Sequence, residues 1–282
     1  MRRPVTGAAV LAVDGEHAHE RRDELATEEP MEIRVHGPGQ DPAPVAVTMR
    51  TPGNDFELAV GLCLTEGIIE SPDDLETIAY CLAPDASQPS GPPQQQYNIV
   101  TVRLRRPVAA DVRARRYLAT SSCGVCGKAA LDEVEVRCAP VGEGPRVAAR
   151  VVRELPELLA ARQRVFDRTG GLHAAAQFTA AGELLTVRED VGRHNALDKL
   201  IGHALLERAL PLADNVLLVS GRLSFELVQK AAIAGIPVLC AVSAPSSLAV
   251  SAAERFGQTV VAFLRGERFN VYTHRERIDL AA

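Results

Sequence analysis

Three strand-like segments that alternate with helix-like segments dominate the C-terminal part of the chain. They read NVLLVS (215–220), IPVLCAVS (236–243) and TVVAFL (259–264), and helical patterns at 224–235 and 246–257 separate them. Continuous apolar runs of this kind are typical of strands that are buried on both faces of a parallel sheet. The β-α-β-α-β order therefore predicts a three-layer α/β sandwich with right-handed crossovers.

The segments just upstream predict further elements of the same α/β unit. HAAAQFT (173–179) and ELLTVRE (183–189) flank an Ala-Ala-Gly turn and are expected to pair as a hairpin. Helices are expected at 155–170, where Gly170 would end the helix, and at 193–209.

The N-terminal half predicts a smaller α+β part. The expected strands are 31–37, 44–50 and 97–104. A helix is expected with Asn54 or Asp55 as its N-cap and Gly67 at its end, and short helical pieces are expected at 108–118 and 128–134. The Pro/Ser/Gln-rich run at 84–96 is interpreted as an inserted loop.

A Gly/Pro-rich stretch at 139–146 suggests where the two parts meet. We expect a flexible leader at 1–28, an N-terminal α+β part at 29–145 that ends in a Cys-x-x-Cys loop, and a C-terminal α/β domain at 146–282. No internal repeat is found.

Charge and composition argue against two classes of partner. The net charge is −5, and the chain has no Trp and only 4% aromatic residues, so no nucleic-acid partner is expected. No apolar run reaches the ~18 residues that span a bilayer, so no membrane partner is expected. The apolar stretch Gly7–Val13 is marginal for an export signal, because charge follows it at once. These features predict a protein of the reducing cytoplasm.

The carboxyl ends of the three parallel strands are where such sheets bind ligands. They read Ser220–Ser224, Ser243–Ser247 and Arg265-Gly266. Two of them run into helix N-termini, which favour an anion such as phosphate, although Ser224 and Ser246 could equally be simple N-caps. The candidate ligand contacts at these ends are Ser220, Gly221, Arg222, Ser243 and Ser246.

Two polar turns precede these strands. EDVGRHN (189–195) is interpreted either as a solvated helix start with Asp190 as the cap, or as a site to which His194 and Asn195 contribute contacts. TGGLH (169–173) has two glycines, which suggest an unusual turn or a close ligand approach, and His173 can equally be a hydrogen-bonded residue of a half-buried strand.

The two thiols of TSSCGVCGK (120–128), Cys123 and Cys126, are the main chemical candidates. Structural zinc needs four ligands, but no second Cys-x-x-Cys or Cys-x-x-His is present, and no His-x-Glu precedes the pair as in zinc deaminases. No zinc is therefore expected. Cys63 and Cys240 lie in apolar segments and are predicted to be core residues.

The surroundings of the pair favour a reactive thiolate. Lys128, the arginines of 113–116 and a following helix N-terminus would lower a thiol pKa. An exposed thiolate on a mobile loop can attack a sulfur donor and carry a persulfide, and a second thiol can release that sulfur through a disulfide. A pair that only docks a partner or senses redox state is the alternative.

From about residue 30 onward the chain resembles the formate dehydrogenase accessory sulfurtransferase family, FdhD. The segments that carry the resemblance are TPGNDFELAVGLCLTEGII (51–69), TSSCGVCGK (120–128), TGGLHAAA (169–176), EDVGRHNALDKLIG (189–202), SGRLSFELVQKAAIAGIPVL (220–239), AVSAPSSLAV (241–250) and RGERFNVYTHRERI (265–278). The first 28 residues and the loop at 84–96 depart from it.

The resemblance implies a function. Such proteins take sulfur as a persulfide from a cysteine desulfurase and pass it to the molybdenum cofactor with two pyranopterin guanine dinucleotides, before that cofactor enters formate dehydrogenase. A delivery chaperone for the cofactor is the alternative, and a zinc-bound deaminase relic is a third option. The C-terminal domain is expected to bind the cofactor with a fold similar to that of cytidine deaminases, and homodimers are expected.

The resemblance also assigns residues. Cys123 would carry the persulfide and Cys126 would act as its relay or resolving partner. The matching cofactor-contacting segment consists of Phe263, Leu264, Arg265, Gly266, Glu267 and Arg268.

Overall fold

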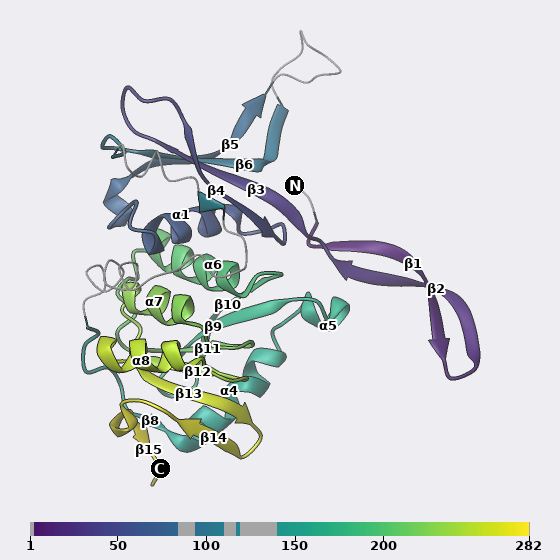
Figure 1. The fold of residues 1–282 in the computed structure, drawn as a ribbon, viewed down its shortest axis with the longest axis vertical. Helices are drawn as coiled ribbons and strands as arrows, with labels where there is room; N and C mark the ends of the chain where they lie inside the picture. Colours follow the sequence, from purple (N-terminus) through teal and green to yellow (C-terminus); the bar gives the residue numbers. More distant parts are fainter. Residues whose placement is uncertain (1–2, 84–93, 110–116, 119–139, 282) are drawn as a thin grey trace.

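The computed structural model describes residues 3–83, 94–109, 117–118 and 140–281. Two sheets are separated by helices, and a two-stranded arm projects from one side (Figure 1). The larger sheet has six strands in the order β10-β9-β11-β12-β13-β14. Their bounds are β9 His173–Thr179, β10 Leu184–Asp190, β11 Asn215–Val219, β12 Val238–Ala241, β13 Thr259–Arg265 and β14 Arg268–Val271.

Strands β11, β12 and β13 are parallel, as the sequence predicts, and the β9–β10 hairpin is antiparallel. Alternate residues of these strands belong to two different cores. Leu217 and Leu239 pack with the helices α6 (Arg193–Leu206), α7 (Phe225–Ile233) and α8 (Ser247–Phe256), whereas Leu218 and Cys240 pack with α4 (Ala149–Ala160). The sheet is thus buried on both faces, which confirms the three-layer α/β sandwich. A likeness to the cytidine deaminase fold stays a prediction.

The smaller sheet has the order β5-β6-β3-β4-β7. Its bounds are β3 Glu29–His36, β4 Ala43–Arg50, β5 Leu75–Ala83, β6 Gln94–Leu104 and β7 Tyr117–Leu118. The three predicted strands are confirmed, β5 was not predicted, and the helical piece expected at 108–118 is wrong at 117–118, which pair with β4. The piece expected at 128–134 lies outside the described residues.

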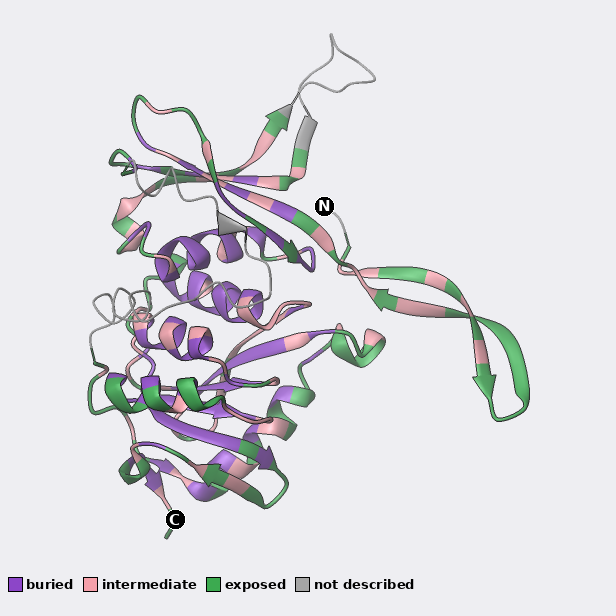
Figure 2. Cartoon of the chain, in the orientation of Figure 1, coloured by how far each residue is buried: buried purple, intermediate pink, exposed green. Residues whose placement is uncertain are grey.

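Helix α1 (Asp55–Thr65) joins the two sheets, because it packs against α6 and both helices belong to one continuous apolar core. Figure 2 shows this junction as densely buried. Asn54 is the N-cap of α1 in a left-handed conformation and makes no side-chain cap bond. The division of the chain at 145/146 stays a prediction.

The flexible leader expected at 1–28 is wrong for its described residues. β1 (Val5–Asp14) and β2 (His17–Ala26) form an antiparallel hairpin that is the projecting arm. Gly15, with φ of 59°, makes the tight turn. At its base, Glu24 forms an ion pair with Arg168 of α5 (Phe166–Thr169).

The single helix expected at 155–170 is also wrong, because two helices replace it. α4 starts earlier, and α5 forms a separate turn that ends at Gly170, whose φ is 64°. The Glu189 carboxylate accepts hydrogen bonds from the backbone N–H of Val165 and of Phe166, at 3.1 and 2.8 Å, and so fixes the start of α5. Beyond the sheet, β8 (Val147–Ala148) pairs with β15 (Ile278–Asp279), and short 3₁₀ turns lie at Pro72–Asp74 and Arg275–Arg277. Among the described residues, no helix is both long and apolar enough to cross a bilayer.

Candidate functional site

The carboxyl ends of β11, β12 and β13 are tied into one rim by backbone hydrogen bonds. The N–H of Leu223 donates to the carbonyl of Ala244 at 3.1 Å, and the N–H of Ser246 donates back to Leu223 at 3.0 Å. The N–H of Phe263 donates to the carbonyl of Ser243 at 3.1 Å. The structure therefore brings the three predicted strand ends together as a fixed edge of the sheet.

The serines of the rim have different roles. The Ser220 hydroxyl accepts a hydrogen bond from the backbone N–H of Ala174 at 2.9 Å, which joins the end of β11 to β9. Ser246 is the N-cap of α8, and its side chain accepts from the Ala249 N–H at 3.1 Å. Arg222 is exposed beside them. The N-cap interpretation is thus confirmed for Ser246, and Arg222 supplies positive charge at the surface.

The segment 263–268 contains a bulge that turns Phe263 outward. Register with β14 shifts between Ala262 and Arg265, and Phe263 has a φ of 55°, an unusual value for a bulky residue. Because the bulge resets the alternation of the strand, Leu264 returns to the core on the α4 side, whereas Phe263 is 43% exposed. An exposed aromatic ring therefore lies at the end of β13.

The rest of this segment is at the surface. Arg265, Gly266, Glu267 and Arg268 are exposed, and Gly266 makes the turn with a φ of 52°. Glu267 forms an ion pair with Arg153 of α4 at 3.4 Å. The side chain of Leu264 is buried and stabilises the fold. A ligand at the end of β13 would therefore contact Phe263, Arg265 and Arg268.

The turn at 189–195 is half-buried, and Asp190 within it is fully buried, so the expected solvated helix start with Asp190 as the cap is wrong. Asp190 is 0% exposed and forms an ion pair with Lys199 at 2.7 Å. Its carboxylate also accepts from the backbone N–H of Thr51 (3.1 Å) and of Gly192 (2.8 Å). Gly192, not Asp190, is the N-cap of α6. A buried charge of this kind needs such partners, and here they link the N-terminal part to the α/β domain.

Asn195 belongs to the same buried network. Its amide nitrogen donates to the Met49 carbonyl at 2.7 Å and to Asp190 at 3.0 Å, and its amide oxygen accepts from the Thr48 hydroxyl at 3.1 Å. Because Asn195 is only 7% exposed, its side chain holds β4 against α6 and does not face the rim. The geometry therefore does not support a cofactor contact through the Asn195 side chain.

His194, by contrast, lies next to the start of α7. Its Nε2 is 3.1 Å from a carboxylate oxygen of Glu226 and 3.2 Å from the Ser224 hydroxyl, which itself donates to Glu226 at 3.0 Å. The hydrogen bond from His194 lowers the pKa of Glu226 to about 2, although burial opposes this shift. Ser224 occupies the N-cap position of α7, but its hydroxyl serves this pair instead of capping the helix. Sequence reasoning did not single out Glu226.

The two thiols proposed for the chemistry, Cys123 and Cys126, lie outside the described residues. Cys63 and Cys240 are buried core residues, as predicted. Burial is the main cause that raises the pKa of each thiol to about 12. Both thiols are thus unreactive at neutral pH. In the described ranges no group of three or more His, Cys, Asp and Glu side chains could hold a metal ion.

A family model that matches most of the chain identifies the family to which this protein belongs. A family model described as the FdhD/NarQ family matches residues 26–279. The chain belongs to the FdhD/NarQ family. The match begins at the last residue of β2 and includes both sheets and the rim.

Similar FdhD/NarQ proteins are named sulfur carrier protein FdhD. That of Streptomyces coelicolor is 52% identical over 267 residues, which cover 93% of this chain and 91% of that protein. That of Mycobacterium tuberculosis is 53% identical over 263 residues, which cover 92% of each chain. That of Sulfurisphaera tokodaii is 46% identical over 257 residues, which cover 91% of this chain and 92% of that protein.

A solved structure supports the fold of this FdhD/NarQ member. It is that of a Desulfotalea psychrophila protein described as a formate dehydrogenase accessory protein. It matches with a TM-score of 0.73 and 24% identity, and covers 98% of this chain and 99% of that one. At this identity the likeness bears on the fold alone, and it agrees with the mixed α/β architecture.

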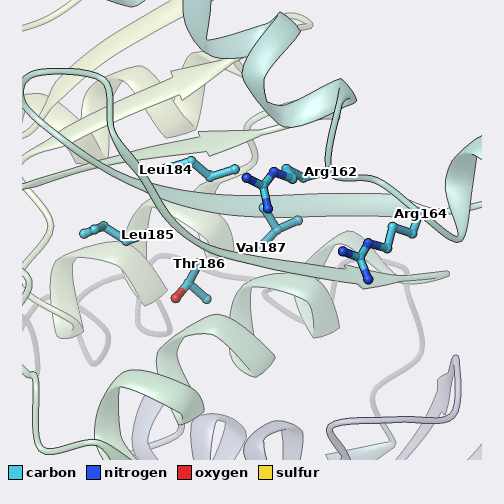
Figure 3. Close-up of a pocket in the computed structure, with 6 residues that line it drawn as sticks. All are labelled: Arg162, Arg164, Leu184, Leu185, Thr186 and Val187. Carbon is cyan, nitrogen blue, oxygen red and sulfur yellow. The ribbon is translucent and has the colours of Figure 1, made fainter.

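The FdhD/NarQ chain also has a shallow hollow of about 220 Å³ at the edge of the large sheet. It lies between the loop after α4, with Arg162 and Arg164, and residues 184–187 of β10 (Figure 3). β10 is the outer strand of the sheet. No residue predicted as a site residue lines this hollow, so it is separate from the rim.

Proposed function

We propose that this protein is a sulfur carrier in formate dehydrogenase maturation, with a persulfide on Cys123 as its covalent intermediate. The observation that carries this proposal is the similarity to named sulfur carriers over more than nine-tenths of the chain. The presence of the two thiols in TSSCGVCGK supplies the chemistry that such a role needs.

The first step is an exchange of sulfur between two proteins. The Cys123 thiolate attacks the outer sulfur of a persulfide on a cysteine desulfurase. A new S–S bond forms on Cys123, the old S–S bond breaks, and the desulfurase cysteine leaves as its thiolate. The sulfur donor thus returns to its resting form, and the carrier holds one extra sulfur.

The second step delivers the sulfur to the molybdenum of a cofactor with two pyranopterin guanine dinucleotides, which is the acceptor substrate. The Cys126 thiolate attacks Sγ of Cys123, the two form a disulfide, and the outer sulfur leaves as sulfide, which becomes a ligand of the metal. A thiol reductant of the cytoplasm then reduces the disulfide. The loaded cofactor passes to formate dehydrogenase.

The rim at the ends of β11, β12 and β13 is the proposed binding site of that cofactor. Guanine dinucleotides carry diphosphates, and the rim presents the start of α8 together with the exposed side chains of Arg222, Arg265 and Arg268. The exposed Phe263 ring offers a face for a guanine base. We further propose that the protein works in the cytoplasm as a homodimer and without zinc.

Intact-mass measurement after incubation with a cysteine desulfurase and cysteine tests the carrier role. The wild-type chain should gain one sulfur that maps to residues 117–128 and is lost on reduction. Cys123→Ala should lose the adduct and formate dehydrogenase maturation. Cys81→Ala is the matched control, because Cys81 is a free, half-buried thiol in β5 and should leave both unchanged.

A delivery chaperone whose Cys pair only docks or senses redox state is the second candidate. It predicts that Cys123→Ala keeps cofactor binding and much of the maturation. An unmodified wild-type mass together with retained GDP binding would favour that function over sulfur transfer.

A further inference from the structure

A cluster of basic side chains lies at the β9 end of the rim, beside the residues discussed so far. His173 starts β9 and pairs with Asp190 at the end of β10. Arg193 is the first residue of α6, and Gly221 follows the end of β11. A β-carbon placed on Gly221 would lie 3.2 Å from Nδ1 of His173 and 3.9 Å from Cδ of Arg193. Three elements thus meet at this corner, and the absence of a side chain on Gly221 keeps it open.

The negative charges around the corner are already matched. Asp190 is neutralised by Lys199 at 2.7 Å, and Glu226 is paired with His194 at 3.1 Å. Arg193 is different: within the described part of the chain, no carboxylate forms an ion pair with it, and its Nε is buried without a hydrogen-bond partner. The charge of Arg193 helps to lower the pKa of Glu226, so that carboxylate is near, but it is already paired with His194. Arg193 thus keeps an unused donor at a half-buried place, where an anion would stabilise its charge.

His173 shares this environment and is half-buried. Burial is the main cause that lowers its pKa, and the charges of Arg193 and His194 lower it further, whereas Asp190 opposes the shift. His173 is thus neutral at pH 7 in the free protein. A bound anion would favour the imidazolium and reverse this shift, so binding would be accompanied by proton uptake at His173.

We infer that His173 and Arg193, together with the backbone at Gly221, form a seat for a phosphate group of a nucleoside diphosphate. This inference rests on the proposed function, because the cofactor proposed there carries guanosine diphosphate units. It extends the rim beyond Phe263–Arg268 to the opposite side of the parallel strands. The first turn of α6 adds backbone N–H groups that have no acceptor within the helix.

The test is the affinity of the full-length protein for three probes: GDP, inorganic pyrophosphate and guanosine. Arg193→Gln removes the charge and should weaken GDP and pyrophosphate binding by about tenfold or more, since a charge-assisted hydrogen bond is lost. Guanosine binding should not change. Arg193→Lys should restore most of the pyrophosphate affinity. Arg208→Gln is the matched control, because Arg208 is an exposed arginine just beyond the other end of α6.

His173→Gln tests the proton linkage. Calorimetric titration in buffers of different ionisation enthalpy measures the protons taken up when GDP binds. The wild-type chain should take up more protons than His173→Gln, and its advantage in affinity over that variant should grow from pH 8 to pH 6. The comparison of the two proteins at each pH cancels the titration of the ligand's own phosphate.

Two results would overturn the seat. If Arg193→Gln binds GDP and pyrophosphate as tightly as the wild type, the cofactor binds elsewhere on the protein, and the proposed function stands. If the wild type binds neither probe, the seat does not exist, and the persulfide measurement on Cys123 decides the sulfur-carrier role separately. Circular dichroism and thermal melting of each variant establish that a loss of binding is not a loss of folding.

Discussion

Gly61 of α1 and Gly202 of α6 touch backbone to backbone. A β-carbon on Gly202 would lie 2.9 Å from the backbone nitrogen of Gly61 and nearer still to the carbonyl oxygen of Glu57. A β-carbon on Gly61 would likewise meet the nitrogen of Gly202 at 2.9 Å. This contact lets the two helices pack closely, and these helices join the N-terminal part to the α/β domain.

Gly202→Ala should therefore destabilise the protein strongly. The added methyl group cannot be accommodated unless α1 and α6 move apart, and overpacking of this kind costs about 1–3 kcal/mol or more. Urea unfolding gives the free energy of unfolding. Gly7→Ala in β1 is the control, because nothing lies within 4 Å of its added carbon. Equal stability of Gly202→Ala and the wild type would mean that the helices do not pack this closely.

The buried pair of Asp190 and Lys199 makes a second prediction. Either Asp190→Asn or Lys199→Met alone leaves a buried group without its partner, and each should cost about 3–5 kcal/mol of unfolding free energy. The double variant should cost clearly less than the sum of the two. Arg208→Gln, at an exposed ion pair with Asp73, should change little. Additive effects in the double-mutant cycle would contradict the direct interaction.

The pair of Glu226 and His194 predicts a dependence of stability on acid pH. The folded-state pKa of Glu226 is about 2, below the ordinary value of 4.5. Its contribution to stability is thus present above pH 4.5 and is lost as the pH falls toward 2. Melting temperatures from pH 6 to pH 2 should fall less steeply for Glu226→Gln than for the wild type. Glu157→Gln, at an exposed position of α4, should follow the wild-type curve.

From β9 onward the sequence predicts the α/β domain well, because its strands are apolar runs and helices α6, α7 and α8 lie close to the expected ranges. β11, β12 and β13 lie where the pattern puts them, and so does the β9–β10 hairpin. The rim follows from the same pattern, since parallel strands end at one edge. Its residues could therefore be named before their geometry was known.

Other features depend on contacts between distant segments, which periodicity does not reveal. The sequence pattern predicts that Asp190 is a solvated helix cap, yet Thr51 and Lys199, from other segments, contact its buried carboxylate. The N-terminal hairpin was missed because β2 is highly charged, although Asp14-Gly15 is a turn signal that could have identified it. Arg193 draws attention only once the structure shows that its buried Nε has no hydrogen-bond partner.

Phe263 makes the last prediction, because its left-handed φ of 55° costs energy that glycine avoids. Phe263→Gly and Phe263→Ala both remove the exposed ring, but only the alanine variant keeps the conformational cost. The glycine variant should thus be more stable than the alanine variant by about 1 kcal/mol, as measured by urea unfolding. Both should bind GDP equally weakly if the ring stacks on guanine, whereas Phe263→Tyr should retain binding. An alanine variant that binds GDP like the wild type would exclude the ring as a guanine contact, and the strain would then serve only to return Leu264 to the core.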